Sequence, residues 1–407
     1  MVLKGALFAL AFAALVPVLY DWARLLVLFY KNAPGRMAPV NNLGEYEVKF
    51  TEIIRSCEDA LLVESAGLAI LACDPGREKW NTVMGIFLPG PVADAGLYAY
   101  DYANASAVDA DALRQIEIRG FERGADFHTL GIAYDEATGT LFAANHRRGG
   151  GGGAAVEAFA LDLGALTATH ARTIRHPLLH APNAIAVAGG GELLVTNDHG
   201  FAARRWPRLA ALETYLGLPL GTVVHVDLGA PGGGVRARVL ARLAFANGVA
   251  LLDARTVAVA STSAAAVQLY DFAPRPPALA PRARLRLPFL PDNLHVARDG
   301  ALLVAGHPHP PALSRFARSR DACNGGGDGG RCDADAAPAP SWVSRWTEAR
   351  GLEHVYAGSE YPTSSTALFD AERRVGIVTG LRAATIAGGD FASKDGYRRR
   401  WDSSNNE

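Results

Sequence analysis

The sequence of 407 residues has little net charge and few cysteines. Forty Lys and Arg against 41 Asp and Glu give a net charge of −1, which excludes a broad electrostatic surface for nucleic acid. Four cysteines are too few for a small disulfide-held scaffold. No Gly-x-Ser-x-Gly elbow occurs, and the five glycines of 149–153 precede no Lys-Ser/Thr pair. A serine-hydrolase elbow and a phosphate loop are therefore both excluded.

A long apolar run occurs only near the N-terminus, at residues 5–20. At about 16 residues this run is short for a spanning helix. Asp21 and Arg24 interrupt it before residues 25–30 resume the apolar pattern. We interpret residues 1–32 as a signal or anchor segment for the secretory pathway, with membrane association through residues 5–30. A buried helix of the domain is the alternative. On the secretory interpretation, Asn104-Ala105-Ser106 is a glycosylation acceptor.

The remaining chain repeats one pattern six times: an apolar strand, a short polar or glycine turn, and a second apolar strand. These hairpins cover residues 60–73, 131–145, 184–197, 249–261, 294–306 and 367–380. Their spacing is typical of propeller blades with loop insertions. The sequence therefore predicts an all-β fold, one six-bladed β-propeller over residues 40–387, followed by a disordered polar tail at 388–407. A pair of β-sandwiches is the alternative.

Two segments interrupt the hairpins. Residues 201–218 carry apolar side chains at helical spacing despite Pro207, which predicts a short lid helix over one propeller face. Residues 320–340 contain a glycine-rich stretch between Cys323 and Cys332 and are expected to form a long surface loop.

Polar residues stand just before four of the six hairpins, at equivalent offsets. Because the first strand of each blade lines the central channel, these side chains are expected to meet on the axis. Two carboxylates and three amides form an oxygen-rich set that suits Ca²⁺ better than Zn²⁺. For any single Asn or Asp, a turn role is the alternative. The set comprises Glu58, Asn183, Asn247, Asp292 and Asn293, and Asp59 stands directly after Glu58.

Histidines form a second set near the far ends of the second strands. His146, His307 and the Asp198-His199 pair occupy these ends, and His128 lies just before the second hairpin. Histidines at the mouth of a metal channel serve as a general base or as a donor to substrate. Packing in polar loops is the alternative for each of them.

These residues resemble the serum paraoxonase/arylesterase family of six-bladed propeller hydrolases, within a superfamily that includes strictosidine synthase-like and gluconolactonase-like proteins. The resemblance runs from about residue 56 to 310, with a weaker match near SSTALFD. Its motifs are Cys57-Glu58-Asp59, LGIAYD with AANH, TIRHPLL, PNAIAV with LLVTNDH, ETYLGL, FANG, and PDNLHV with VAGHP.

The resemblance implies a role for each matched residue. His146 matches one member of a histidine pair near the substrate, His199 and His307 match residues at the active-site mouth, and Asp59 matches a ligand of a second, structural calcium. The matches to the ligands of the catalytic calcium are Glu58, Asn183, Asn247, Asp292 and Asn293.

The sequence departs from the family pattern at three positions. Leu130 replaces the other histidine of the pair, with His128 two residues upstream as a substitute, and a further family histidine falls near Ala265. Ala184 stands where the family has an acidic ligand of the structural calcium. The resemblance therefore supports the catalytic ion and leaves the second ion without part of its ligand set.

The four cysteines fit a secretory compartment. Cys57 and Cys73 flank the first hairpin, so antiparallel pairing would place them nearly opposite, and Cys323 and Cys332 close the glycine-rich loop. The sequence predicts two local bridges, with free thiols as the alternative.

The leading functional hypothesis is a calcium-dependent esterase or lactonase acting on a small-molecule ester. The metal would act as a Lewis acid on the carbonyl oxygen, and a water activated by His146 or Asp292 would attack the carbonyl carbon. The alternatives are a gluconolactonase-like sugar lactonase and a noncatalytic calcium-stabilised propeller that binds a lipid or a protein.

Overall fold

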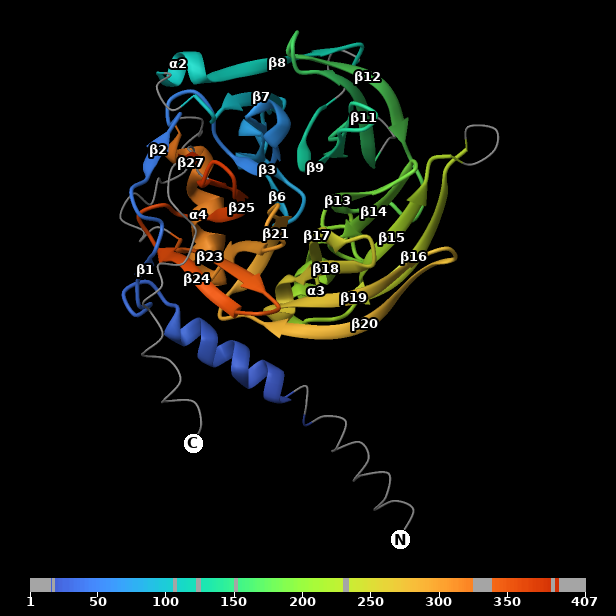
Figure 1. Cartoon of the computed structure of the whole chain (residues 1–407). Coiled ribbons are helices and arrows are strands. Elements are labelled where there is room, and N and C mark those ends of the chain that lie inside the picture. The colour runs from blue at the N-terminus through green and yellow to red at the C-terminus, as the bar shows by residue number, and fades with distance from the viewer. Residues whose placement is uncertain are drawn as a thin grey trace.

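The computed structural model describes residues 16, 19–104, 108–121, 126–149, 153–229, 234–324, 339–381 and 385–387. Its strands form six four-stranded antiparallel units around one axis (Figure 1). Unit 1 contains β3 (Cys57–Val63), β4 (Leu68–Cys73), β7 (Gly96–Asp101) and β8 (Leu113–Arg119). Unit 2 contains β9 (Thr129–Asp135), β10 (Thr140–His146), β11 (Ala154–Asp162) and β12 (Thr167–Ile174). Their outer strands β8 and β12 pair in parallel, which joins the two units into one eight-stranded sheet.

The next four units continue around the ring. Unit 3 contains β13 (Pro182–Gly189), β14 (Glu192–Asn197), β15 (Gly221–Asp227) and β16 (Arg236–Leu243). Unit 4 contains β17 (Ala246–Asp253), β18 (Thr256–Ser261), β19 (Ala266–Pro274) and β20 (Pro277–Arg286). Unit 5 contains β21 (Leu290–Val296), β22 (Leu302–His307), β23 (Ser341–Thr347) and β24 (Gly351–Gly358), with β1 (Val40–Asn41) on its outer edge. Unit 6 contains β25 (Ser364–Asp370), β26 (Val375–Gly380), β27 (Thr385–Ala387) and β2 (Glu47–Lys49).

The ring closes on itself. Each inner strand (β3, β9, β13, β17, β21 and β25) contacts the next, and β25 contacts β3. The outer strand of unit 6 comes from the N-terminal side of the chain, because β2 pairs with β27 through Glu47 opposite Ala387. The predicted propeller is confirmed, and each predicted hairpin coincides with the two innermost strands of one unit. Apolar clusters between neighbouring units form the core; Val195 and Val224 of unit 3, for example, pack with Val156 of unit 2.

Two helices follow the inner hairpins of units 3 and 5 and border the axis of the ring. The predicted lid is α3 (Pro207–Leu216), and a second helix, α4 (Pro310–Cys323), covers residues that we expected to be loop from Arg320 onward. That expectation was wrong because Pro310 and Pro311 stand in the first helical turn, where proline is tolerated, and the side chain of His309 caps the N-terminus. Residues 325–338 of the expected loop lie outside the described residues. The short elements are α2 (Asp109–Ala112), η1 (Glu64–Ala66), η2 (Pro75–Glu78), η4 (Thr262–Ala264), β5 (Trp80–Asn81) and β6 (Ile86–Phe87).

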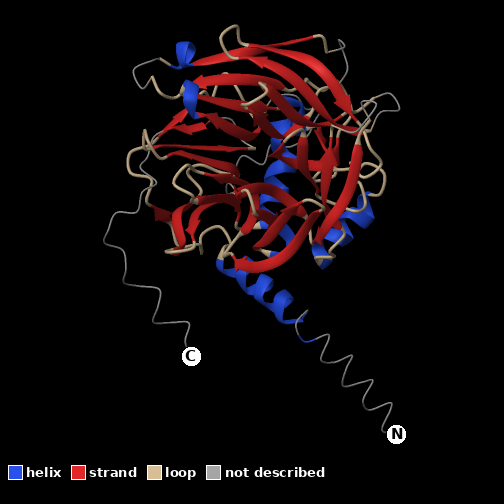
Figure 2. Cartoon of the chain, turned by 45° about the vertical axis from the view of Figure 1, so that its right-hand side comes forward, coloured by secondary structure: helices blue, strands red, loops and turns tan. Residues whose placement is uncertain are grey.

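A helix over residues 19–31 leads into the propeller from the N-terminal side (Figure 2). It is fastened at its end, where the side-chain amide of Asn32 donates to the carbonyls of Pro288 and Pro308 at 2.7 and 3.2 Å. Among the described helices, none has the length and apolar character needed to cross a bilayer. Membrane association therefore stays a prediction. Residues 1–15, the serine of the glycosylation triplet and the tail at 388–407 lie outside the described residues.

The first predicted disulfide is present. Cys57 and Cys73 are bonded and face each other at the ends of β3 and β4. Cys323 is also disulfide-bonded, and its predicted partner Cys332 lies outside the described residues.

Candidate active site

The inner strand of every unit is interrupted by a β-bulge near its start. The register shifts at Glu58 in β3 and at Leu130 in β9. In the other four inner strands the register shifts at the corresponding position, between two paired residues. A bulge bends its strand and re-aims a side chain. Five of the bulge side chains consequently line one cavity at the axis, namely Glu58, Leu130, Asn183, Asn247 and Asp292. The sequence offset that suggested convergence thus corresponds to a repeated backbone feature.

Glycine at two of these bulges permits close packing of the inner strands. A Cβ on Gly131 would lie 2.5 Å from the carbonyl oxygen of Asn183, and one on Gly248 would lie 2.7 Å from that of Asp292. Neither position can carry a larger residue without moving the backbone of the neighbouring strand. The absence of a side chain at Gly131 and Gly248 therefore allows the neighbouring inner strands to approach closely at the bulges.

The cavity at the axis has a volume of about 260 Å³. One end carries the polar bulge residues, while α3 and α4 contribute apolar side chains such as Ala210 and Leu313. The apolar wall is completed by Val83, Met84, Ala203, Pro207, Phe245 and Pro310. A substrate with an apolar body and one polar group fits such a lining.

Three buried oxygens in this cavity have no hydrogen-bond partner among the described residues. They are Oε2 of Glu58, Oδ1 of Asn183 and Oδ1 of Asn247. Buried oxygens normally find a partner, because an unsatisfied polar atom costs about 1–3 kcal/mol. Three such atoms from three strands are the donor set that a hard cation requires. The residues present therefore fit the predicted calcium.

The amide groups are oriented by their nitrogens. Nδ2 of Asn183 donates to Asp198 at 3.4 Å, and Nδ2 of Asn247 donates to Thr262 at 3.2 Å and to Asp292 at 2.6 Å. Since each nitrogen is engaged, each Oδ1 is left free for a cation. Asn293 is placed differently: its Nδ2 donates to the Glu58 carboxylate at 3.2 Å, so it also positions that ligand.

The surroundings of Glu58 disfavour its ionised form. Burial raises the pKa of Glu58 to about 8; the Arg77 guanidinium opposes this rise, and the Asp292 and Asp59 carboxylates add to it. A bound divalent cation would stabilise the ionised carboxylate and lower that pKa. A cation beside Glu58 would therefore offset the cost of burying its carboxylate.

Asp59 lies on the other side of the bulge. It borders a second cavity of about 180 Å³ together with Asn293 and Ala184. Its carboxylate already accepts hydrogen bonds from the backbone amides of Ala60 and Ile132, each at 2.8 Å, and from the Thr366 hydroxyl at 3.0 Å. These donors occupy much of its capacity, and Ala184 offers no oxygen from its side chain.

His307 is the histidine best placed for base chemistry. Its Nε2 lies 2.9 Å from Oδ2 of Asp292, and both side chains line the axial cavity. Since a carboxylate only accepts, Nε2 carries the proton, and Nδ1 is left as a lone pair with no partner among the described side chains. This is the base–orienter geometry of a catalytic dyad.

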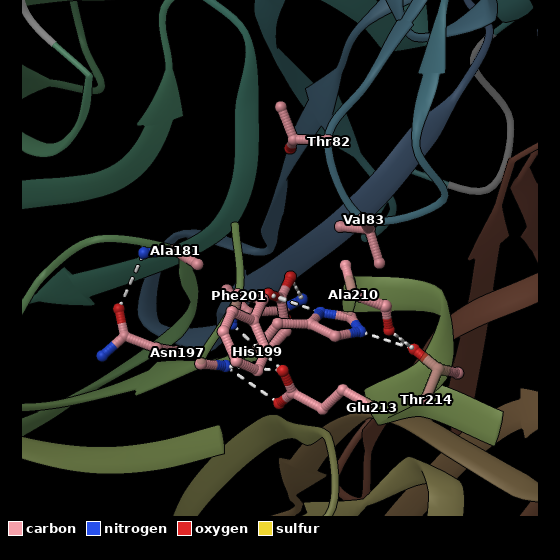
Figure 3. A network of polar contacts seen from close by, with 12 residues as sticks. Thr82, Val83, Ala181, Asn197, His199, Phe201, Ala210, Glu213 and Thr214 are labelled. Atoms are coloured by element: carbon pink, nitrogen blue, oxygen red, sulfur yellow. Dashed lines mark hydrogen bonds and ion pairs between the residues drawn. The ribbon is translucent and has the colours of Figure 1, made fainter. Parts of the chain in front are cut away.

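His199 also lines the cavity but is fully engaged (Figure 3). The hydroxyl of Thr214 donates to the Ala210 carbonyl at 3.0 Å, so it accepts from Nε2 of His199 at 2.6 Å. Nδ1 lies 2.9 Å from the Asp198 carboxylate, which requires a second proton. Although burial opposes charge, Asp198 raises the pKa of His199. Both ring nitrogens are therefore engaged by partners, which leaves neither of them to take a proton from a water.

Glu213 fastens the lid helix beside this histidine. Its buried carboxylate accepts from the backbone amide of Gly200 at 2.8 and 3.1 Å and from that of Phe201 at 3.0 Å. Figure 3 shows Glu213 and Thr214 reaching from α3 toward the loop that carries His199. The lid is therefore held by hydrogen bonds as well as by apolar contact.

His146 and His128 lie outside the lining of the axial cavity. Nε2 of His146 donates to the Pro182 carbonyl at 2.6 Å, and its Nδ1 lies 2.8 Å from the Thr82 hydroxyl. Burial lowers the pKa of His146, which keeps the ring neutral. Nδ1 of His128 lies 3.3 Å from Asp74. The structure therefore does not bring these two histidines to the ligand set, and their catalytic roles stay predictions.

Arg77 was missed by sequence analysis. It lines the axial cavity, lowers the pKa of Glu58 and donates a hydrogen bond to the Thr129 carbonyl. Its place in the sequence could have indicated this role, because Arg77 comes soon after the second strand of unit 1. The residues His146, Asp198 and His307 likewise stand at or just after the end of the second strand of their units.

Comparison with known proteins gives a consistent result. The arylesterase family model matches residues 93–323. Serum paraoxonase/arylesterase 1 of Rattus norvegicus is 34% identical over 157 residues, covering 38% of this chain and 41% of the relative. The same protein of Mus musculus is 32% identical over 205 residues, covering 49% of this chain and 54% of the relative. The chain thus spans about half the length of these relatives.

Among solved structures, a gluconolactonase from Xanthomonas campestris superposes with a TM-score of 0.48 at 17% identity, covering 86% of this chain and 91% of the other.

Proposed function

The chain belongs to the arylesterase family, and on this premise we propose that it is a calcium-dependent hydrolase of carboxylic esters. The substrates would be aryl esters, lactones or both. The ion would be held by the oxygens of Glu58, Asn183, Asn247, Asp292 and Asn293.

One observation carries this proposal: three bulge residues from three strands present unpartnered buried oxygens to a single cavity. An oxygen set of this kind matches the preference of Ca²⁺ for six to eight oxygen ligands, with waters and the substrate filling the remainder. When bound, the ion would supply Lewis-acid polarisation of the substrate carbonyl.

The chain itself would supply the base. Nδ1 of His307 accepts a proton from the attacking water, and Asp292 holds the ring through its contact with Nε2 at 2.9 Å. Asp292 also stabilises the imidazolium that forms. A serine nucleophile is not needed in this scheme. His199 and Arg77 line the same cavity, and the guanidinium of Arg77 favours the negative charge that develops on the carbonyl oxygen.

The cavity wall favours aromatic or alkyl substrates. Side chains such as Met84, Phe245 and Leu313 would contact the body of the substrate, and a sugar lactone would leave its hydroxyls without partners there. We therefore rank aryl esters and lipophilic lactones above sugar lactones.

We also infer an oxidising, secretory compartment for the chain. The Cys57–Cys73 bridge supports this location, because disulfides of this kind persist where thiols are not kept reduced.

The test is hydrolysis of phenyl acetate and of γ- and δ-lactones, measured with calcium and with excess chelator. Asn247→Ala removes one free oxygen, so calcium affinity and hydrolysis should fall together. Asn42→Ala, at an exposed position outside the cavity, is the control. Equal hydrolysis with and without calcium would overturn the proposal. Calcium bound at the axis without hydrolysis of any ester would instead indicate a noncatalytic propeller.

A further inference from the structure

We propose that Asp94, Asp126 and His128 form a second metal site, suited to Zn²⁺ and separate from the axial calcium set. Asp94 lies before β7 of unit 1, and the other two residues precede β9 of unit 2. One ligand atom from each of the three lies within 4.8 Å of the other two. Neither His128 nor the two carboxylates line the axial cavity.

Both carboxylates are positioned by backbone amides. The amide of Phe127 donates to Oδ1 of Asp94 at 3.3 Å, and that of Gly149 donates to Oδ2 of Asp126 at 2.7 Å. Each donor fixes one oxygen of its carboxylate, and the other oxygen of Asp126, Oδ1, lies 4.0 Å from Nε2 of His128.

The imidazole of His128 points independently to a ligand. The residue is only 2% exposed, and its Nε2 is buried with no hydrogen-bond partner among the described residues. Its Nδ1 lies 3.3 Å from the carboxylate of Asp74, which is 1% exposed. Because the carboxylate accepts, Nδ1 carries the hydrogen and Nε2 presents its lone pair toward Asp126. A histidine that binds zinc through one ring nitrogen usually donates the N–H of its other ring nitrogen to a carboxylate, as His128 does to Asp74.

The donor set selects the metal. One imidazole nitrogen and two carboxylate oxygens suit a first-row divalent ion, and zinc accepts three protein ligands with water in the fourth position. Bonds of about 2.0–2.1 Å in a tetrahedron place ligand atoms roughly 3.3 Å apart. The side chains would therefore close by up to about 1.5 Å around the ion. Asp94 is exposed, which gives the ion a path from solvent.

A bound ion would connect unit 1 to unit 2. Asp94 would supply a ligand from the first unit, and Asp126 and His128 from the second. Metal bound only by the folded chain raises its melting temperature. The site therefore has a readout that does not depend on hydrolysis.

The experiment is a titration of chelator-treated full-length protein with Zn²⁺ in the presence of saturating calcium. We expect one equivalent to bind, the melting temperature to rise, and Co²⁺ to give the absorption bands of a four-coordinate site. His128→Gln and Asp126→Asn should abolish all three signals. Asp74→Asn should weaken zinc affinity about 10- to 100-fold, the usual cost of losing an outer partner.

Asp162→Asn serves as the control at an exposed carboxylate of β11. Asn247→Ala, in the axial set, should still bind zinc, so failure of the calcium proposal would not imply failure here. If His128→Gln does not fold, the exposed Asp94→Asn variant supplies the same test. Absence of stoichiometric zinc binding, or unchanged affinity in Asp126→Asn and Asp94→Asn, would overturn the proposal.

Discussion

Nε2 of His307 lies 2.9 Å from Oδ2 of Asp292, while the other oxygen of the same carboxylate accepts a hydrogen bond from Asn247 at 2.6 Å. One carboxylate therefore links the candidate base to the candidate ligand set. Since the two groups share this side chain, the position of the ring depends on the geometry of the metal site. Loss of the ion is then expected to disturb the base as well.

Replacing His307 by Gln should lower kcat for phenyl acetate by about 10²- to 10⁴-fold, the usual contribution of a general base. KM and calcium affinity should change little, because the substitution spares the unpartnered oxygens. Steady-state kinetics with calcium titration measures all three. His176→Gln, outside the axial cavity, is the matched control. A His307→Gln enzyme with normal kcat would exclude this residue as the base.

The metal-free protein should lose stability as pH rises. Burial raises the pKa of Glu58 to about 8, from an ordinary value of 4.5, so the folded state holds this proton more tightly than the unfolded state. The contribution of Glu58 to the free energy of unfolding is therefore greatest below about pH 4.5 and is lost by about pH 8.

Thermal melts of the chelated protein at several pH values test this expectation. The decline between pH 5 and 8 should be smaller in Glu58→Gln, whose amide does not titrate, and smaller in the wild type with saturating calcium. The same slope in the variant and in the chelated wild type would assign the effect to other groups.

Removing the Glu213 carboxylate should loosen the lid helix. Glu213→Ala leaves the amides of Gly200 and Phe201 without their acceptor, at a cost of about 1–3 kcal/mol for a buried unsatisfied group. We expect faster amide exchange in residues 199–217 and a higher KM, with less effect on strands of units 5 and 6. Leu212→Ala, an exposed change on the same helix, is the comparison. Unchanged exchange in Glu213→Ala would contradict the anchoring role.

The Cys57–Cys73 bridge should stabilise the fold and the position of the candidate calcium ligand Glu58. The cysteines are 16 residues apart, and closing a loop of this length is worth about 3 kcal/mol on the chain-entropy model. The double variant Cys57→Ala, Cys73→Ala should unfold at lower denaturant concentration. Its calcium affinity should also fall, because Cys57 immediately precedes Glu58. Equal unfolding midpoints for variant and wild type would show that the bridge contributes nothing.

The fold could be predicted from sequence because the inner hairpins are local. Each hairpin of two strands and a turn lies within about 14 residues, and its alternating apolar residues indicate the strands. The positions of Asn183 and Asn247 also followed from a common offset before the hairpins. The sequence did not reveal that the offset corresponds to a bulge, since Asn and Asp before a strand are equally typical of turns.

Other features depend on contacts between distant segments. The parallel pairing of β8 with β12 and the pairing of β2 with β27 have no local signal. The N-terminal turn of α4 was hidden by two prolines. The contact between His307 and Asp292 joins two paired strands of unit 5. The second ring nitrogen of His199 is engaged only because the lid helix supplies the hydroxyl of Thr214. Side-chain chemistry at such sites is set by tertiary packing, so residue types alone could not rank the histidines.

The pairing of β2 with β27 also constrains the order of assembly. β2 is synthesised long before its partner, so a chain still leaving the ribosome carries an unpaired strand edge until the last unit emerges. Such edges are sites of aggregation. Charged residues on β2, Glu47 and Lys49, stand at this edge and discourage wrong pairing during that interval. Biogenesis of this protein therefore depends on protecting β2 until β27 is available to pair with it.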